Sequence, residues 1–204
     1  MTKYGMAVDM QRCTACNRCS MACIVEHNLP DGVLWTHAVA EGGDYDRTPG
    51  GTYPDKLTMK FYTISCQHCD TPLCFASCPT GAITKRDDGI VMTDMEACIG
   101  CEACVPACPY EARTFIDGEP TYQLDFAVGS GEVHLANTPP KCTFCVERVD
   151  RGENPRCVEV CYSHARTFGD LDDPDSEISK LLAERDYEQL LTDQGTGPNI
   201  YYLK

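Results

Sequence analysis

The sequence has no run of apolar residues that approaches the ~18 needed for a membrane-spanning helix. We therefore predict no direct membrane span. The segment from Met1 to Arg12 has the pattern of a short strand and leads straight into Cys13, so we expect no signal peptide. Neither glycine-rich phosphate-binding pattern, G-x-x-x-x-G-K-S/T or G-x-G-x-x-G, is present. We also find no Ser/His/Asp set, so the sequence indicates no catalytic site of its own.

Basic residues are scarce relative to acidic ones. The chain has 17 Lys and Arg against 31 Asp and Glu, and its formal net charge is −14. Such a chain has no general electrostatic attraction to nucleic acid or anionic lipid, and we expect no nucleic-acid partner. The range Asp170–Asp193 alone contains nine acidic and two basic residues. We interpret this run as a solvated outer face, with a docking surface for a basic partner as the alternative.

Cysteine, by contrast, is abundant. The 16 cysteines form four groups of four, here called quartets one to four. They are Cys13, Cys16, Cys19 and Cys23; Cys66, Cys69, Cys74 and Cys78; Cys98, Cys101, Cys104 and Cys108; and Cys142, Cys145, Cys157 and Cys161. Quartets one and three share the spacing C-x₂-C-x₂-C-x₃-C, and Pro79 and Pro109 follow quartets two and three. Because the quartets use every cysteine, no thiol is left for a nucleophile, and this internal repeat organises the chain.

Disulfides and zinc are the alternative explanations for so many cysteines. A disulfide scaffold suits short secreted chains, and we expect no signal peptide here. Structural zinc usually takes two ligands from each of two knuckles, so the Cys142/Cys145 pair alone would be ambiguous. Three thiolates on one tight loop, followed by a fourth and then proline, instead match the bacterial 4Fe–4S pattern. The fourth cysteine of such a quartet binds the neighbouring cluster, so we expect the quartets to function in pairs.

The spacing between quartets indicates how they pair. Only residues 79–97 separate quartets two and three. Within them, the sequence TGAITKRDDGIVMTD predicts two short strands around an Asp-Asp-Gly turn. That is enough for one compact two-cluster unit, and it leaves quartet one to pair with quartet four. This pairing would bring the N-terminal and C-terminal regions together around the central unit.

With all 16 cysteines in register between Tyr4 and Gly169, the chain resembles the four-cluster ferredoxin subunit of molybdopterin oxidoreductases of the dimethyl sulfoxide reductase superfamily. Polysulfide, thiosulfate, tetrathionate and arsenate reductases carry similar subunits. The resemblance specifies the type of subunit and not the substrate of its partner. One position departs from the family: Tyr162 follows Cys161 where proline is common. We expect ligation to survive, with a different turn and different packing over that cluster.

Carried over cysteine by cysteine, the resemblance implies four 4Fe–4S clusters with crossed ligands. Cluster 1 would take Cys13, Cys16, Cys19 and Cys161, and cluster 2 would take Cys23, Cys142, Cys145 and Cys157. Cluster 3 would take Cys66, Cys69, Cys74 and Cys108, and cluster 4 would take Cys78, Cys98, Cys101 and Cys104. These 16 thiolates would be the iron ligands, and no catalytic residue is expected.

The expected fold is α+β, with two bacterial two-cluster ferredoxin-like units related by pseudo-symmetry. Residues 1–60 and 119–169 would form the first unit, with 31–60 as a loop insertion. Residues 61–118 would form the second unit, and residues 170–204 an acidic C-terminal helix and strap.

The C-terminal region has recognisable helix signals. We predict a helix over Asp173–Gln194, with Asp173 as the cap and Pro174 in the first turn. An apolar stripe of Ile178, Leu181 and Leu182 would pack against the first unit. The closing sequence NIYYLK predicts an extended strap, either along this chain or along a partner.

Several residues outside the quartets also have expected roles. Trp35 is expected to anchor a local core, with an interface hot spot as the alternative, and His68 to lie beside a cluster without being a ligand. Tyr110 and Tyr162 are expected to shield sulfur from water. Four cations near the cluster loops are candidates for raising reduction potentials, with surface solvation as an equal alternative; they are Arg12, Arg18, Lys85 and Arg86.

The sequence thus predicts a non-catalytic subunit that relays single electrons through four clusters to or from a large molybdopterin (Mo or W) catalytic subunit. A membrane quinol-oxidising anchor subunit is a further candidate partner. The alternatives are a relay subunit of a hydrogenase, carbon monoxide dehydrogenase or nitrite reductase system, and a zinc-binding scaffold. We expect assembly in the cytoplasm and export with a signal-bearing catalytic partner to the outer face of the cytoplasmic membrane; the alternative is a cytoplasmic complex.

Overall fold

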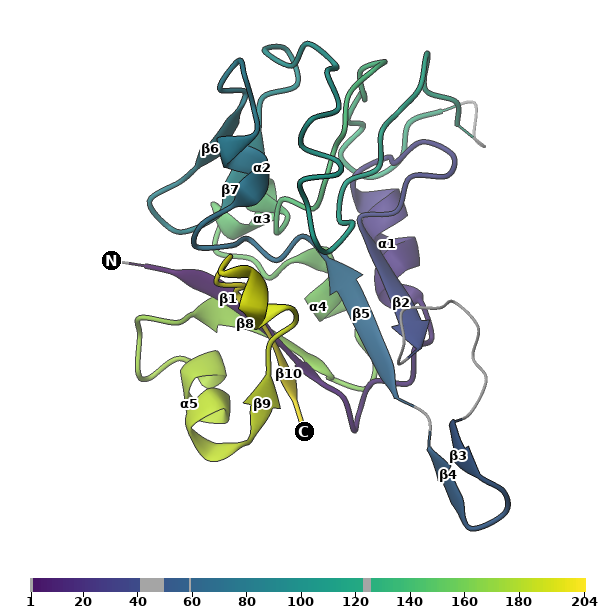
Figure 1. Ribbon diagram of the computed structural model, residues 1–204, viewed down its shortest axis with the longest axis vertical. Helices are drawn as coiled ribbons and strands as arrows, with labels where there is room; N and C mark the ends of the chain where they lie inside the picture. The colour runs from purple at the N-terminus through teal and green to yellow at the C-terminus, as the bar shows by residue number, and fades with distance from the viewer. Residues whose placement is uncertain (1, 41–49, 59, 123–125) are drawn as a thin grey trace.

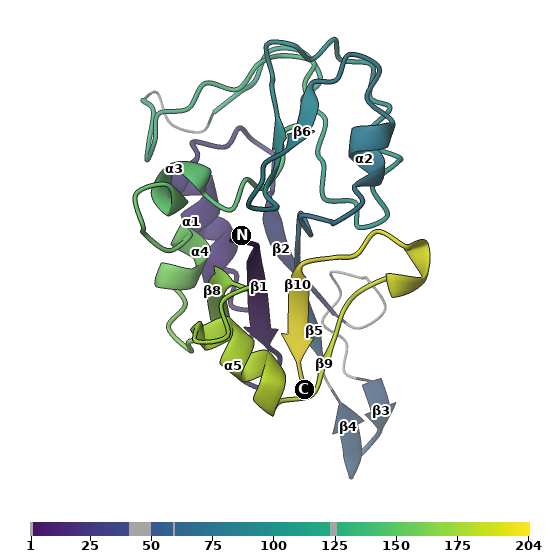
Figure 2. The same ribbon diagram turned by 90° about the vertical axis from the view of Figure 1, so that its left-hand side faces the viewer.

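The computed structural model describes residues 2–40, 50–58, 60–122 and 126–204. Figures 1 and 2 show short strands and helices, with the main sheet toward one end of the molecule and loop-rich segments toward the other. This mixture confirms the expected α+β composition. The loop insertion expected at 31–60 lies partly outside the described residues, at 41–49 and 59.

The largest sheet joins distant parts of the chain. Its strands lie in the order β8 (Arg166–Asp170), β1 (Tyr4–Asp9), β10 (Ile200–Leu203) and β9 (Tyr187–Glu188). β1 is parallel to β10, whereas β8 and β9 are antiparallel to the strands beside them. The strand expected before Cys13 is therefore confirmed as β1. It lies inside the sheet, between β8 and the C-terminal strand β10 (Figure 1).

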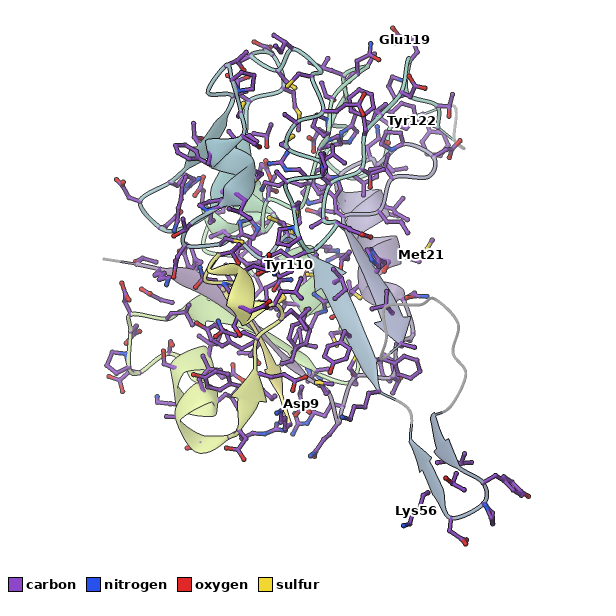
Figure 3. The ribbon with its side chains drawn as sticks, in the orientation of Figure 1. Asp9, Met21, Lys56, Tyr110, Glu119 and Tyr122 are labelled. Atoms are coloured by element: carbon purple, nitrogen blue, oxygen red, sulfur yellow. The ribbon has the colours of Figure 1, made fainter. Side chains whose placement is uncertain are left out.

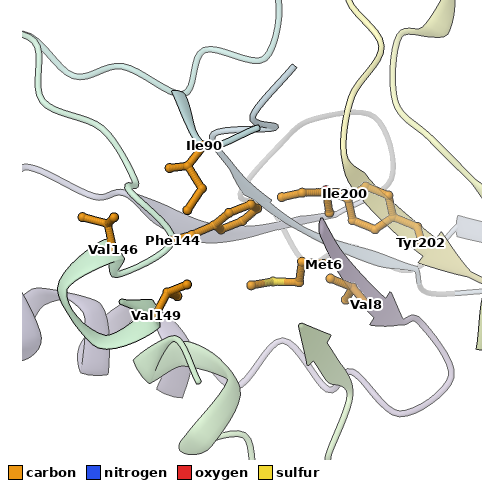
Figure 4. Packing of buried hydrophobic residues seen from close by; sticks show 8 residues of the cluster. All are labelled: Met6, Val8, Ile90, Phe144, Val146, Val149, Ile200 and Tyr202. Atoms are coloured by element: carbon orange, nitrogen blue, oxygen red, sulfur yellow. The ribbon is translucent and has the colours of Figure 1, made fainter. Parts of the chain in front are cut away.

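The main apolar core lies between this sheet and the segment that carries quartet four (Figure 4). Successive strand residues face opposite sides of a sheet, so Met6 and Val8 of β1 point into this core. Ala7, between them, faces the other side, where it packs with Ile178 and Leu203. The buried members of the main core are Met6, Val8, Ile90, Phe144, Val146, Val149, Ile200 and Tyr202.

The C-terminal helix is shorter than the sequence predicted. α5 spans Glu177–Glu184, and its cap is Ser176, whose side chain accepts a hydrogen bond from the Ser179 N–H. The expectation that Asp173 caps the helix and that it continues to Gln194 is wrong. Asp173 instead accepts from the Asp175 N–H in a local turn. The helix ends because the chain turns into β9, which pairs with β10.

The apolar stripe on α5 is placed as expected. Ile178 is fully buried beneath β1, and Leu181 and Leu182 pack partly buried against the same cluster. The closing strap lies along this chain, since Ile200–Leu203 is strand β10. Tyr202 of that strand is fully buried and donates a hydrogen bond to the Thr63 carbonyl oxygen, 3.1 Å away.

Three antiparallel strand pairs complete the sheets of the described residues. β2 (Thr36–Ala40) pairs with β5 (Phe61–Ser65), and β3 (Gly50–Thr52) pairs with β4 (Lys56–Thr58) in a hairpin that projects from the body (Figures 1 and 2). β6 (Ile83–Lys85) pairs with β7 (Val91–Thr93). This last hairpin confirms the two strands expected between quartets two and three.

Five short helices remain among the described residues, and all but the first are single turns. They are α1 (Arg18–Glu26), α2 (Leu73–Ala76), α3 (Val146–Val149), α4 (Arg156–Glu159) and the 3₁₀ turn η1 (Thr192–Gln194). Helices of four residues are not stable alone, so their shape depends on what they pack against. No helix within the described parts of the chain is both long and apolar enough to cross a membrane.

Candidate metal centres

All 16 cysteines are described, and all are free thiols. The disulfide alternative is therefore wrong for this fold. Among the described residues, no three His, Cys, Asp or Glu side chains form a group that could hold a single metal ion. The ligands of a 4Fe–4S cube bind different irons, so they need not converge on one point as zinc ligands do.

The C-x₂-C segments that open the four quartets share one backbone feature. In each, the residue just before the second cysteine has a positive φ: Ala15 (50°), His68 (44°), Gly100 (69°) and Phe144 (55°). Positive φ is uncommon outside glycine, and here it recurs at the same place in four separate loops. Gly100 is also crowded, because a Cβ there would lie 2.7 Å from the Asn137 carbonyl oxygen. The internal repeat in the sequence is thus a repeat in backbone conformation.

Three small cavities are each lined by four cysteines from two quartets. One contains Cys66, Cys69, Cys74 and Cys108. Another contains Cys23, Cys142, Cys145 and Cys157. The third contains Cys78, Cys98, Cys101 and Cys104. In every case three cysteines come from one quartet and one from another. Four thiols around one cavity, each able to give up its proton, are the donor set that a 4Fe–4S cluster needs.

Of the remaining four cysteines, Cys13, Cys19 and Cys161 lie near one another across quartets one and four. Burial raises the pKa of Cys13, and the nearby Cys19 and Cys161 act in the same direction. The Thr14 and Tyr162 hydroxyls, 2.8 Å apart, join the first loop to the turn after Cys161. Tyr162 is 55% exposed, and its expected shielding of sulfur stays a prediction. Through this contact the Tyr162 side chain joins two distant cysteine segments, at the position where similar subunits commonly have proline.

Backbone and hydroxyl groups are directed at several sulfurs. Burial opposes ionisation of Cys161, but contacts from Ser163 and from the Ala165 N–H, 3.3 Å from the sulfur, lower its pKa. Most buried thiols behave oppositely: burial and the neighbouring Cys66 raise the pKa of Cys69 to about 12. These cysteines bind iron only as thiolates. Cluster insertion must therefore remove protons from thiols that the fold otherwise keeps neutral.

The cations expected to lie near the clusters point elsewhere. Lys85 contacts Asp70, and Arg86 binds Asp88 and Asp150 at the surface. Arg12 contacts Asp9 at 3.6 Å. No side-chain contact to sulfur is found for these residues or for Arg18 in the described structure, which favours surface solvation for all four.

Three other cations, which the sequence did not single out, are buried beside the cysteines. Arg166 is 6% exposed, Arg113 is 5% exposed and Lys141 is 2% exposed. The Arg166 Nη1 lies 3.6 Å from Cys157 Sγ. Burial lowers the pKa of each arginine, but neighbouring cysteines outweigh it and raise the pKa of both Arg113 and Arg166. A spacing signal that the sequence-based reasoning missed marks these positions: Arg113 and Arg166 each lie five residues after the last cysteine of a quartet, and Lys141 directly precedes Cys142.

His27 is a further residue that the sequence did not indicate. Its Nε2 lies 3.2 Å from Cys145 Sγ, and its Nδ1 lies 3.5 Å from Glu132 Oε2. A metal-bound thiolate can only accept a hydrogen bond, so Nε2 must carry the proton when Cys145 is a ligand. Trp35 packs against the His27 ring with centroids 4.6 Å apart and is 3% exposed. Trp35 is therefore confirmed as the anchor of a local core.

His68 and Tyr110 both lie in the cysteine-rich interior. His68 is fully buried, stacks on Phe144 with centroids 3.7 Å apart, and accepts a hydrogen bond from the Val91 N–H through Nδ1. Burial lowers its pKa well below the usual range, so the ring is neutral. Tyr110 packs with Cys66 near the centre of the molecule (Figure 3), and its hydroxyl lies 2.6 Å from Thr196 Oγ1. Tyr110 covers sulfur as expected.

The C-terminal segment also holds quartet two in place. The Asp70 N–H donates to the Gly197 carbonyl and the Asn199 N–H donates to the Gln67 carbonyl, both at 2.8 Å. The Asn199 side-chain amide also donates to the His68 carbonyl at 2.8 Å. The strap therefore reaches beyond the sheet and fastens the Cys66–Cys69 loop.

Cysteines drawn crosswise from paired quartets, on loops of one repeated conformation, define a ferredoxin-type iron–sulfur protein. Residues 57–123 and 132–171 match the family model described as a 4Fe-4S dicluster domain. The chain belongs to this family of iron–sulfur electron-transfer subunits and carries four 4Fe–4S clusters.

Several known proteins are similar over the whole chain. It is 43% identical, over 100% of its own length and 79% of the relative, to an iron–sulfur subunit described for a dimethyl sulfoxide reductase of Halobacterium salinarum. It is 36% identical to the iron–sulfur subunit of the arsenate respiratory reductase of Shewanella sp., over 99% of this chain and 96% of that one. It is also 36% identical to one of the chains of polysulfide reductase from Wolinella succinogenes, over 98% and 94% of the two proteins.

Proposed function

We propose that this chain is the non-catalytic subunit of a reductase-type complex, bound stably to a large molybdopterin subunit containing Mo or W. Its clusters, when bound, accept and donate single electrons; the residues of the chain hold them in place and set their surroundings. The observation that carries the proposal is the gathering of cysteines four by four from different quartets. The names of the relatives favour a pterin enzyme over a hydrogenase, carbon monoxide dehydrogenase or nitrite reductase system.

The crossed ligand sets are part of this proposal. Clusters 2, 3 and 4 correspond to the three cavities lined by four cysteines. Cluster 1 would use Cys13, Cys16, Cys19 and Cys161, supported by the proximity of Cys13 to Cys19 and Cys161 and by the Thr14–Tyr162 contact. We further propose that clusters 1 and 2 form one ferredoxin-like unit and clusters 3 and 4 a pseudo-symmetric second one.

Neighbouring ligands support a linear order of the clusters, which spacing alone left open. Clusters 1 and 2 exchange ligands between quartets one and four, and clusters 3 and 4 between quartets two and three. Cys142 of cluster 2 packs with Cys66 of cluster 3 in one apolar group. Electrons would therefore pass in the order 1–2–3–4 or its reverse, with clusters 1 and 4 at the ends.

Purification from the native host tests the proposed function. The chain should come down with a much larger subunit that contains molybdenum or tungsten, and it should carry about sixteen irons, four per cluster. A chain isolated with zinc in place of iron, or without any such partner, would contradict the proposal.

Because the clusters need cytoplasmic assembly, we propose export after folding with a signal-bearing partner; fractionation of the cells separates this from a cytoplasmic complex. Co-purification of a quinol-oxidising membrane subunit would identify an anchor.

A further inference from the structure

Three buried cations lie between the cysteine sets, one between each pair that would be adjacent. They are Arg166, Lys141 and Arg113. None of them has a carboxylate partner among the described residues, although every one is at least nine-tenths buried. This differs from Arg86, whose guanidinium binds two carboxylates at the surface.

Arg166 lies between the ligands of clusters 1 and 2. Its side chain lines the cavity of cluster 2, and Nη1 is 3.6 Å from Cys157 Sγ. The nearby Cys19 and Cys13, which belong to cluster 1, raise the pKa of Arg166. The remaining contacts are neutral: Nη1 lies 3.3 Å from the Met6 sulfur and Nη2 lies 3.3 Å from Thr36 Oγ1.

Arg113 occupies the equivalent place between clusters 3 and 4. It lines the cavity of cluster 3 and interacts with Cys74 on that side and Cys104 on the other. Its two donated hydrogen bonds go to the Pro139 carbonyl (3.1 Å) and to Thr93 Oγ1 (3.2 Å), and both residues line the cavity of cluster 4. The Arg113 Nε is buried without a hydrogen-bond partner.

Lys141 lies between clusters 2 and 3. Its Nζ donates to the carbonyl oxygens of Cys142, a cluster 2 cysteine, and of Val91. The same side chain lines the cavity of cluster 3. It thus stands where the two proposed units meet.

A buried cation without a counter-charge is destabilising, since desolvation of an ion is offset only by a nearby opposite charge. For these three residues the only anionic groups at hand in the described structure are the cysteine thiolates. A 4Fe–4S cluster with four thiolates gains one further negative charge on reduction. A fixed cation at low local dielectric therefore stabilises the reduced form more than the oxidised form, and does so for every cluster within its reach.

We propose that the positive charges of Arg166, Lys141 and Arg113 tune the electron path. Each of them raises the reduction potentials of the two clusters it separates. This inference rests on the ligand sets proposed above. It also accounts for an otherwise costly arrangement: one uncompensated buried cation at every junction between adjacent clusters.

Redox titration of the purified complex, followed by electron paramagnetic resonance, tests the proposal. Arg166→Gln should lower the midpoint potentials of two clusters, and Arg113→Gln should lower those of the other two. Lys141→Met should lower one from each pair. This overlapping pattern is not expected from a general loss of packing. The charge-preserving variants Arg166→Lys, Arg113→Lys and Lys141→Arg should restore most of each shift, and Arg86→Gln should leave all four potentials unchanged.

A second set of variants keeps each arginine and offsets its charge with a new carboxylate. Thr36→Asp and Thr93→Asp place carboxylates beside Arg166 and Arg113, and each should lower the same pair of potentials as the corresponding Gln variant. If a Gln variant fails to load clusters while its Lys counterpart loads them, the charge requirement is supported. Failure of both would overturn it, because shape and not charge would then be needed.

The outcomes also separate this inference from the proposed function. A wild-type complex with four reducible clusters whose potentials do not move in the neutral variants would overturn the inference alone. A wild-type protein with fewer than four clusters would count against the ligand sets themselves.

Discussion

Single cysteines decide which cluster a quartet completes. Cys101 and Cys108 belong to the same quartet, yet they line different cavities. The side chain of Cys108 instead lies near Cys66. Burial raises the pKa of Cys108, and Cys66 acts in the same direction. The crossing ties the two halves of a unit together through iron, so folding and cluster insertion are expected to be coupled.

We therefore expect Cys101→Ser and Cys108→Ser to damage different clusters. Cys101→Ser should perturb cluster 4, and Cys108→Ser should perturb cluster 3. Electron paramagnetic resonance of the folded variants, with iron analysis, would compare the spectral component lost in each. Loss of the same single component in both variants would contradict the crossed assignment.

His27 should tune one cluster selectively. It contacts Cys145, a proposed ligand of cluster 2, and hydrogen bonds to cluster sulfur are one of the factors that set the potential. His27→Phe keeps a ring against Trp35 and removes the donor, so the potential of cluster 2 should fall while the other three stay in place. His37→Phe provides a control, since His37 is a half-buried ring on β2 that lines none of the three cysteine cavities. A shift of all four potentials in the His27 variant would indicate a general structural change instead.

At the scale of elements, the observed helix α5 differs from the expected one in its N-cap residue. Ser176 caps the helix and its hydroxyl also donates to the Asp170 carbonyl at 2.6 Å, whereas Asp173 only closes a local turn. Ser176→Ala should cost about 1 kcal/mol of stability, in line with other N-cap removals. Asp173→Ala should cost less than about 0.5 kcal/mol, as exposed substitutions usually do. Thermal unfolding of the two variants side by side is the measurement; an equal or larger loss for Asp173→Ala would contradict the assignment.

Strand β10 fastens the C-terminal end into the core. Tyr202→Phe leaves the Thr63 carbonyl without its donor and should cost about 1 kcal/mol. Tyr202→Ala also leaves a cavity beside Met6 and Ile200 and should cost about 3–5 kcal/mol. Tyr201→Phe, on the opposite face of the strand and only half-buried, is the matched control. Chemical denaturation of the cluster-loaded protein would rank the three, and a null effect for Tyr202→Ala would rule out this role for the strap.

For the whole molecule, the clusters and the sheet should contribute unequally to order. The sheet around β1 has an apolar core, whereas α2, α3 and α4 are four-residue helices beside cysteines. Removing iron with an oxidant and a chelator should increase hydrogen exchange over the cysteine-rich loops at 66–108 and 142–161. Amides of β1 and β8 should exchange later, because their pairing and burial remain. Uniform exchange across both regions would show instead that the clusters hold the sheet together as well.

Cysteine spacing alone was enough to indicate the cofactor, because ligation of a cluster by one loop is a local property of a few adjacent residues. The β6–β7 hairpin and β1 were predictable for the same reason, since turn residues and alternation act over short distances. The end of α5 was not, because the pairing of β9 with β10 overrides the helical pattern that continues past Glu184. The crossed ligand sets and the division into two units stay predictions.

Other features exist only in the folded chain. Arg166 and Thr36 contact each other across 130 positions of sequence, and His27 and Cys145 across 118. Closeness to a quartet along the chain does not predict these contacts, because Arg12, which directly precedes Cys13, and Arg86 point to carboxylates. Whether a cation is solvated or buried beside sulfur depends on which distant segments pack over it. The local pattern therefore decides where the iron is bound, and the tertiary packing decides which charges surround it.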